Sequence, residues 1–244
     1  MKKFIVGGLM LFGFCLLIVS LAGAMGGPAA EKTELEESKP IVLGPSFLIE
    51  DFESGSLRSP REWWTFDVKR ADVVGNDKYA EGEEVVTGDV GKYSLMLKGK
   101  AANWYVGGCG SYLAKEGQNL SKHDTFVLDV YGNGKGSGTL KVELFDDDNG
   151  NYQVEQDPAK NYLPIYDDKL VYDVVVDWEG WKRVEIPLND FVDDNSGTGD
   201  DVWNPQQENA SGGFLQFQFV CIAAGEDAEI NFNLDNIKLT VNGE

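Results

Sequence analysis

Apolar and polar residues alternate with a period of two over long segments in the C-terminal half of the chain. The alternation is clear in residues 214–220 and 228–241. Residues 181–188 repeat it as far as Pro187, whose nitrogen cannot donate to a strand ladder. A period of two places one side of an extended segment in the core and the other side in water. These segments therefore predict strands with one buried face.

Shorter apolar segments upstream, separated by Gly, Asn and Asp, predict further strands. They cover residues 46–53, 93–98, 103–109, 125–131, 139–145 and 170–176. Residues 69–89 are charged and irregular, and no segment keeps a helical period over three turns. Short strands at fairly even spacing, joined by such turns, are typical of an all-β sandwich or barrel.

The predicted strands have a core side that can be read from the same alternation. It carries Phe126, Leu128, Val130, Leu140, Val142, Leu144, Leu215, Phe217 and Phe219. The opposite side carries polar and aromatic residues, and these are the candidates for binding.

The first 24 residues have the pattern of a signal peptide. Lys2 and Lys3 precede an apolar run over residues 4–21, and the small residues Ala22, Gly23 and Ala24 follow it. An uncleaved membrane anchor is the alternative, since the run approaches the ~20 residues that span a bilayer. Residues 25–45 show no periodicity and predict a short disordered leader. We therefore expect an exported protein, periplasmic, at the cell surface or extracellular, whose domain occupies residues 46–244.

The chain without its signal peptide is strongly acidic. Removing Lys2 and Lys3 leaves 19 basic against 41 acidic residues, a net charge of 19 − 41 = −22. Such a surface repels nucleic acid and anionic lipid, so neither nucleic acid nor, after cleavage, a membrane is an expected partner. Cys109 and Cys221 also remain, and the sequence leaves open whether they pair or are two buried thiols.

Catalytic motifs are weak. His123 is the single histidine and has no nucleophile motif beside it. Retaining β-sandwich glycanases carry a Glu-x-Asp-x-x-Glu run on one strand, which does not occur here, and Glu143 with Asp146 does not rebuild it. The glycine-rich residues 132–138 join two predicted strands, so they form a hairpin loop and not a phosphate loop. We expect no enzyme activity, with glycoside hydrolysis as a weak alternative.

Calcium is the one cofactor that the sequence suggests. Residues 146–150 look like a calcium loop, but its ligand register would include Phe145, so a plain turn is the stronger interpretation. A second arrangement uses Asp51 and Glu53 from the first strand and Asp235 from the last. If the terminal strands are neighbours, these three carboxylates predict a structural Ca²⁺ site.

The exposed strand faces predict a binding surface for a sugar chain. If the strands around residues 129, 143 and 217 share a sheet, its outer face carries a set of polar and aromatic side chains. These are Asp129, Tyr131, Glu143, Gln216 and Gln218, with Trp104 as a stacking platform from a loop. Amides and carboxylates bond sugar hydroxyls, and aromatic rings stack on sugar C–H faces.

Four segments follow one another in a characteristic order. They are the acidic opening at residues 49–53, the segment 130–142, the segment 178–191 that begins Trp-Glu-Gly-Trp, and residues 234–239. In this order they resemble jelly-roll carbohydrate-binding modules of the galactose-binding-like group. The resemblance spans about residues 47–241. It implies two antiparallel sheets, a structural calcium near the termini and a glycan groove on the concave face.

Together these observations predict non-catalytic binding of a poly- or oligosaccharide by an exported jelly-roll sandwich. The alternative is a structural or adhesive protein of the cell envelope whose partner is another protein.

Overall fold

The computed structural model describes residues 46–76, 90–113, 118–207 and 211–243. All of them belong to one compact unit, Lys39–Glu244. The predicted signal peptide, 1–24, and leader, 25–45, lie outside the described residues. Among the residues that are described, no helix is long and apolar enough to cross a membrane.

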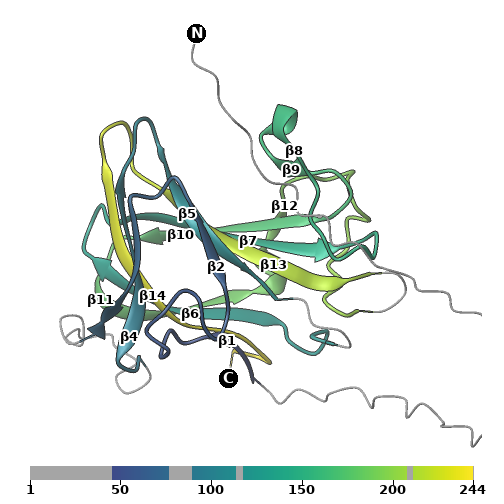
Figure 1. The fold of residues 1–244 in the computed structure, drawn as a ribbon, viewed down its shortest axis with the longest axis horizontal. Coiled ribbons are helices and arrows are strands. Elements are labelled where there is room, and N and C mark those ends of the chain that lie inside the picture. Colours follow the sequence, from purple (N-terminus) through teal and green to yellow (C-terminus); the bar gives the residue numbers. More distant parts are fainter. Residues whose placement is uncertain (1–45, 77–89, 114–117, 208–210, 244) are drawn as a thin grey trace, which may run out of the picture. The chain divides into compact units, whose positions relative to one another are not determined.

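One sheet, called sheet 1 below, runs in the order β11-β6-β14-β4-β3 (Figure 1). β1 also belongs to it and pairs with the second half of β14, whereas β4 pairs with the first half. The strand bounds are β1 Ser46–Glu50, β3 Arg70–Gly75, β4 Tyr93–Lys100, β6 Thr125–Asn133, β11 Glu179–Pro187 and β14 Glu229–Thr240.

The other sheet, sheet 2, runs in the order β12-β10-β7-β13-β5-β2. Its bounds are β2 Trp63–Phe66, β5 Tyr105–Tyr112, β7 Gly138–Asp147, β10 Lys169–Val176, β12 Val192–Asp193 and β13 Gly213–Ile222. Both sheets are antiparallel, and the chain passes repeatedly from one to the other, as between β4, β5, β6 and β7. The predicted all-β jelly-roll sandwich is therefore confirmed.

A small hairpin interrupts the path from β7 to β10. β8, Gln156–Asp157, pairs with β9, Leu163–Pro164, and a one-turn 3-10 helix at Pro158–Lys160 connects them. A second such turn, Leu188–Asp190, follows β11. The hairpin matters because it forms one wall of the groove described below.

The core lies between the two sheets and contains, except for Leu215, the residues that the alternation predicted. The side chains from β6, β7 and β13 in that set are all fully buried or nearly so. Phe217 contacts Trp63 edge-on, with ring centroids 5.3 Å apart. Trp63 donates from its indole nitrogen to Glu50, so its polar end is satisfied within the core.

Two local predictions were wrong. A β-bulge between Phe214 and Gln216 makes Leu215 the extra residue, so Phe214 joins the core cluster although the alternation had placed it outside. Arg70–Gly75 was predicted to be irregular but forms the edge strand β3, which pairs with β4. Charged side chains suit an edge strand because one of its sides faces water.

Cys109 and Cys221 are free thiols in the core, on neighbouring strands of sheet 2. Burial raises the pKa of Cys221 to about 12. Burial first, and then the neighbouring Cys221, raise the pKa of Cys109 well above its usual value. Both thiols therefore stay protonated at neutral pH.

Candidate ligand-binding groove

A groove of about 780 Å³ lies over the outer face of sheet 2. Its floor comes from the strands, one wall from β2 and β5, and the other wall from the β8–β9 hairpin. The lining residues are Trp64, Phe66, Asp67, Trp104, Tyr105, Lys141, Glu143, Gln156, Pro158, Asn161, Tyr162, Lys169, Asp194, Gln218 and Val220.

Two glycines of β5 let aromatic side chains of the edge strand β2 lie across the sheet. A Cβ at Gly110 would lie 2.5 Å from the Trp64 ring, and one at Gly108 would lie 2.7 Å from the Phe66 ring. Without those Cβ atoms, Trp64 and Phe66 reach over β5 towards the groove. Trp64 also contacts Tyr112, with ring centroids 5.0 Å apart.

Trp104 and Tyr105 extend this aromatic wall. Trp104 is 54% exposed, and its ring meets the Tyr105 ring edge-on at a centroid distance of 5.9 Å. The Tyr105 hydroxyl donates to Asp67 Oδ2 at 3.0 Å. Burial, followed by this hydrogen bond, raises the pKa of Tyr105, so the hydroxyl keeps its proton.

Charged and amide side chains form a connected network on the floor. Gln218 Nε2 donates to Glu143 Oε2, and Lys169 Nζ contacts Glu143 Oε1 at 2.9 Å and Asp194 Oδ2 at 2.9 Å. Burial lowers the pKa of Lys169, but the two carboxylates outweigh burial and raise it overall. The single charge of Lys169 is shared by the two carboxylates and holds each in one orientation, while each keeps further lone pairs for a ligand hydroxyl.

The hairpin wall supplies a further ring and an amide. Asp157 caps the 3-10 turn by accepting from Ala159 N at 2.9 Å, and Asn161 ends it in the left-handed conformation. Tyr162 follows and is 63% exposed. An exposed ring therefore faces the groove from each side.

Three of the predicted binding residues, Trp104, Glu143 and Gln218, line this groove together. Gln216 lies two residues before Gln218 on β13 and on the same side of the sheet, but it is 5% exposed and is not among the lining residues. The sequence did not predict Lys169, Tyr162 or Asp194. Lys169 and Tyr162 depend on how the insertion after β7 folds back, and Asp194 depends on the place of the loop after β12.

Asp129 and Tyr131 do not belong to this surface, which corrects the prediction that they share a sheet with Glu143. Both lie on β6, which pairs with β11 and β14 in sheet 1. Asp129 is 1% exposed and bonded to Arg183. Tyr131 packs edge-on against Trp181, with centroids 5.6 Å apart. Alternation gives the side of a strand that is buried but not the sheet to which the strand belongs.

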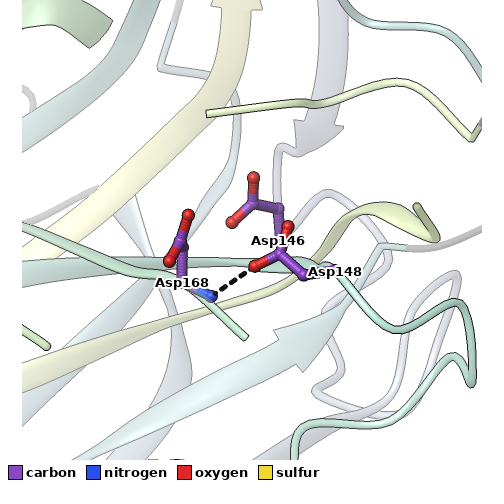
Figure 2. Close-up of side chains that lie close together, drawn as sticks. All are labelled: Asp146, Asp148 and Asp168. Carbon is purple, nitrogen blue, oxygen red and sulfur yellow. Dashed lines mark hydrogen bonds between the residues drawn. The ribbon is translucent and has the colours of Figure 1, made fainter. Parts of the chain in front are cut away.

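A cluster of three carboxylates lies at the end of β7. Oxygen atoms of Asp146, Asp148 and Asp168 all lie within 4.8 Å of one another (Figure 2). Burial, above all, raises the pKa of Asp146 to about 8 and of Asp168 to about 7, and repulsion from Asp148 adds to both. Asp146 and Asp148 belong to the acidic turn segment 146–150, whereas Asp168 lies about twenty residues further along the chain.

Two of the three carboxylates of the predicted terminal calcium site already accept hydrogen bonds, and the third has an unpartnered oxygen. Asp51 Oδ1 accepts from Glu53 N at 3.1 Å, and Glu53 Oε1 accepts from Lys92 N and Tyr93 N. Asp235 Oδ2 is buried without a hydrogen-bond partner, as is Asn76 Oδ1. Burial, with repulsion from Asp129 and Glu53, raises the pKa of Asp235 to about 8. An unpartnered acidic oxygen suits a cation, and the site stays a prediction.

Comparison of the fold with solved structures returned carbohydrate-binding modules. A family 11 module from Clostridium thermocellum, in complex with a β-1,3-1,4-mixed-linked tetrasaccharide, is 18% identical. The match covers 80% of this chain and 95% of that one, with a TM-score of 0.47. A family 30 module of a cellulosomal cellulase from the same organism is 16% identical. The match covers 82% of this chain and 99% of that one, with a TM-score of 0.43.

A xylan-binding domain of family 22 is also similar, at 16% identity over 81% of this chain and 95% of that one, with a TM-score of 0.38. No family model and no curated protein sequence matched the chain. At such identities residue roles do not transfer between proteins.

Proposed function

We propose that the groove on the outer face of sheet 2 binds a neutral poly- or oligosaccharide without cleaving it. The observation that carries the proposal is the pairing of exposed rings on both walls with an oriented polar floor. Trp104 and Tyr162 are the most exposed rings, and Gln218, Glu143 and Lys169 are the floor. Sugar rings present apolar C–H faces and hydroxyl edges, which match these two kinds of surface.

The negative net charge of the protein disfavours anionic polysaccharides as ligands. The whole chain carries a net charge of −20, so a polyanion would meet long-range repulsion. The two lysines of the groove, Lys141 and Lys169, are already paired, with Asp173 at 3.5 Å and with Glu143 and Asp194. A neutral glycan needs no free cation, and its hydroxyls can donate to the carboxylates that remain.

The arrangement of the groove acids supports binding without hydrolysis. Glu143 uses one oxygen for Lys169 and the other for Gln218, and Asp67 accepts from Tyr105. Glycoside hydrolysis needs one carboxylic acid that gives a proton and a second that attacks or activates water. Both oxygens of Glu143 are already engaged, so a transferable proton on either one would have to displace the contact with Lys169 or with Gln218.

Affinity electrophoresis tests the proposal. The probes are soluble mixed-linked β-glucan, xylan and mannan, the first two chosen because similar structures were described with a mixed-linked tetrasaccharide and as xylan-binding. We expect retardation in at least one gel and its loss in Trp104→Ala. Tyr93→Ala is the matched control, since Tyr93 is an exposed ring on sheet 1.

Unchanged migration of the wild-type protein in all three gels, together with self-association in solution, would instead favour a structural or adhesive protein. Release of reducing sugar that disappears in Glu143→Gln would favour a hydrolase. Export, inferred from residues 1–24, belongs to the same proposal, because polysaccharides of this kind lie outside the cell. Recovery of the protein without residues 1–24 from the exported fraction would support it.

A further inference from the structure

Three acidic side chains converge where β7 ends and β10 begins. Asp146 is the penultimate residue of β7, Asp148 follows the strand, and Asp168 directly precedes β10. Each uses one oxygen to accept from a backbone nitrogen. Asp146 Oδ2 accepts from Asn204 at 2.8 Å, Asp168 Oδ2 from Val202 at 2.9 Å, and Asp148 Oδ2 from Asp168 at 3.1 Å. The last of these bonds is the dashed line in Figure 2.

The second oxygen of each group has no partner among the described residues. Oδ1 of Asp146, of Asp148 and of Asp168 is buried and accepts no hydrogen bond. Asp146 and Asp168 are 0% and 1% exposed, and no ion pair to the three is present in the described part of the chain. Buried carboxylates without a counter-charge strongly destabilise a fold unless a cation or a proton neutralises them.

From these contacts we propose that Asp146, Asp148 and Asp168 bind a calcium ion. The donor set is all oxygen, which suits Ca²⁺ and not zinc, whose structural sites use Cys and His. Calcium holds oxygen ligands at about 2.3–2.6 Å, so two ligands of one ion lie at most about 5 Å apart. The mutual separation within 4.8 Å meets that limit. Irregular loop geometry also suits calcium better than magnesium, which demands a near-ideal octahedron.

The ion would link three segments beside the groove: the end of β7, the start of β10 and the loop after β12. The backbone nitrogens that bond Asp146 and Asp168 belong to Asn204 and Val202, in the loop after β12. Lys169, next to Asp168, reaches into the groove and contacts Glu143. Calcium at this place therefore holds the loop after β12 and fixes the start of β10, from which a groove residue extends.

The experiment measures the melting temperature of the purified protein in excess EDTA and in CaCl₂. Asp235→Asn serves as the background, because it removes the carboxylate of the terminal site predicted from the sequence. We expect Ca²⁺ to raise the melting temperature of this variant by roughly 5 °C or more, since a ligand of the native state stabilises it by mass action. Adding Asp168→Asn should abolish the rise. A calcium response that is absent in Asp235→Asn, or that survives Asp168→Asn, overturns the proposal.

Terbium luminescence provides a second readout that does not depend on a change in stability. Trp203 lies in the chain between the two residues whose nitrogens bond Asp168 and Asp146, so we expect its indole to sensitise a Tb³⁺ ion held by the cluster. In the Asp235→Asn background we expect sensitised emission that Ca²⁺ displaces and that Trp203→Phe reduces several-fold. Trp104→Phe, at the groove wall, is the matched control and should leave the emission unchanged. Emission that is insensitive to Trp203→Phe would place the ion elsewhere.

Discussion

Arg183 holds Asp129 by two parallel hydrogen bonds, from Nε to Oδ1 at 2.9 Å and from Nη2 to Oδ2 at 3.0 Å. The two residues are directly opposite in the register of β11 and β6. Asn236 Nδ2 donates to the same Oδ2 at 2.9 Å. The carboxylate that the sequence suggested for sugar binding is therefore fully used in joining three strand segments of sheet 1.

Replacing Asp129 with Asn should destabilise the protein by about 3 kcal/mol, because it leaves the Arg183 charge without its buried partner. Chemical denaturation measures the change in the free energy of unfolding. Asp173→Asn is the control, since its contact with Lys141 at 3.5 Å is more exposed and should contribute less than about 1 kcal/mol. Equal losses in both variants would contradict the structural role of Asp129. Sugar binding should be unchanged in Asp129→Asn.

Truncating Phe217 to Ala should cost about 4 kcal/mol of unfolding free energy, in the range seen for large aromatic residues in cores. Phe217 is fully buried and contacts the rings of Trp63, Phe126 and Phe219. Val175→Ala, at an exposed position of β10, should change stability by no more than about 0.5 kcal/mol. A loss below about 2 kcal/mol for Phe217→Ala would mean that the two sheets are not packed through this ring.

Gly110→Ala should weaken glycan binding by roughly tenfold, which corresponds to about 1.4 kcal/mol. The new Cβ would lie 2.5 Å from the Trp64 ring, so the ring must move away from its place over β5. Titration with the glycan retained in electrophoresis measures the effect. Gly134→Ala is the control, because no atom lies within 4 Å of its Cβ and its φ of +86° brings only backbone strain. Unchanged affinity in Gly110→Ala would exclude Trp64 from the binding surface.

Unfolding free energy should fall as the pH rises above about 9, partly through Cys221. Its pKa is raised by burial from 9.0 to about 12, so the unfolded thiol loses its proton before the native one does. The contribution of this thiol is fully present below pH 9 and is lost at roughly 1.4 kcal/mol per pH unit up to about pH 12. Cys221→Ala should show a shallower decline between pH 9 and 11. Parallel curves for the two proteins would contradict the buried thiol.

Local alternation predicted most of the long strands and their core side, but it missed β3 and placed Phe214 on the wrong side. Phe126, Val142 and Phe219 are buried as predicted because strand periodicity depends only on neighbouring residues. Their partners in the sheets depend on contacts between distant segments. The residues of β6 and β7 alternate alike, yet Asp129 faces outward from one sheet and Glu143 from the other. The sequence pattern carries no signal that separates these two cases.

Most of the groove and the acidic cluster were missed for the same reason. The positions of three residues depend on loops that bring distant segments together near the end of β7. These residues are Lys169, Asp194 and Asp168, each twenty or more residues away in the sequence from the side chain that it meets in the groove or in the acidic cluster. Trp104 and Gln218 were found because exposure and residue type alone made them candidates. The EF-hand-like register weighed for residues 145–149 would use Phe145, Asp147 and Asn149. The carboxylates that converge are instead those of Asp146 and Asp148, which alternate with that set.

β1 and β14 lie side by side, with Ser46 opposite Thr240 in the register. The start and the finish of the sandwich therefore meet at one place, and a short linker from residue 243 to residue 46 would join them without disturbing either sheet. New ends could then be opened between Gly134 and Gly136, where a side chain would meet no other atom. The turn between β6 and β7 connects the two sheets and is not the hairpin loop that the sequence predicted. It lies apart from the groove-lining residues, so such a circularly permuted chain should keep the fold and the groove.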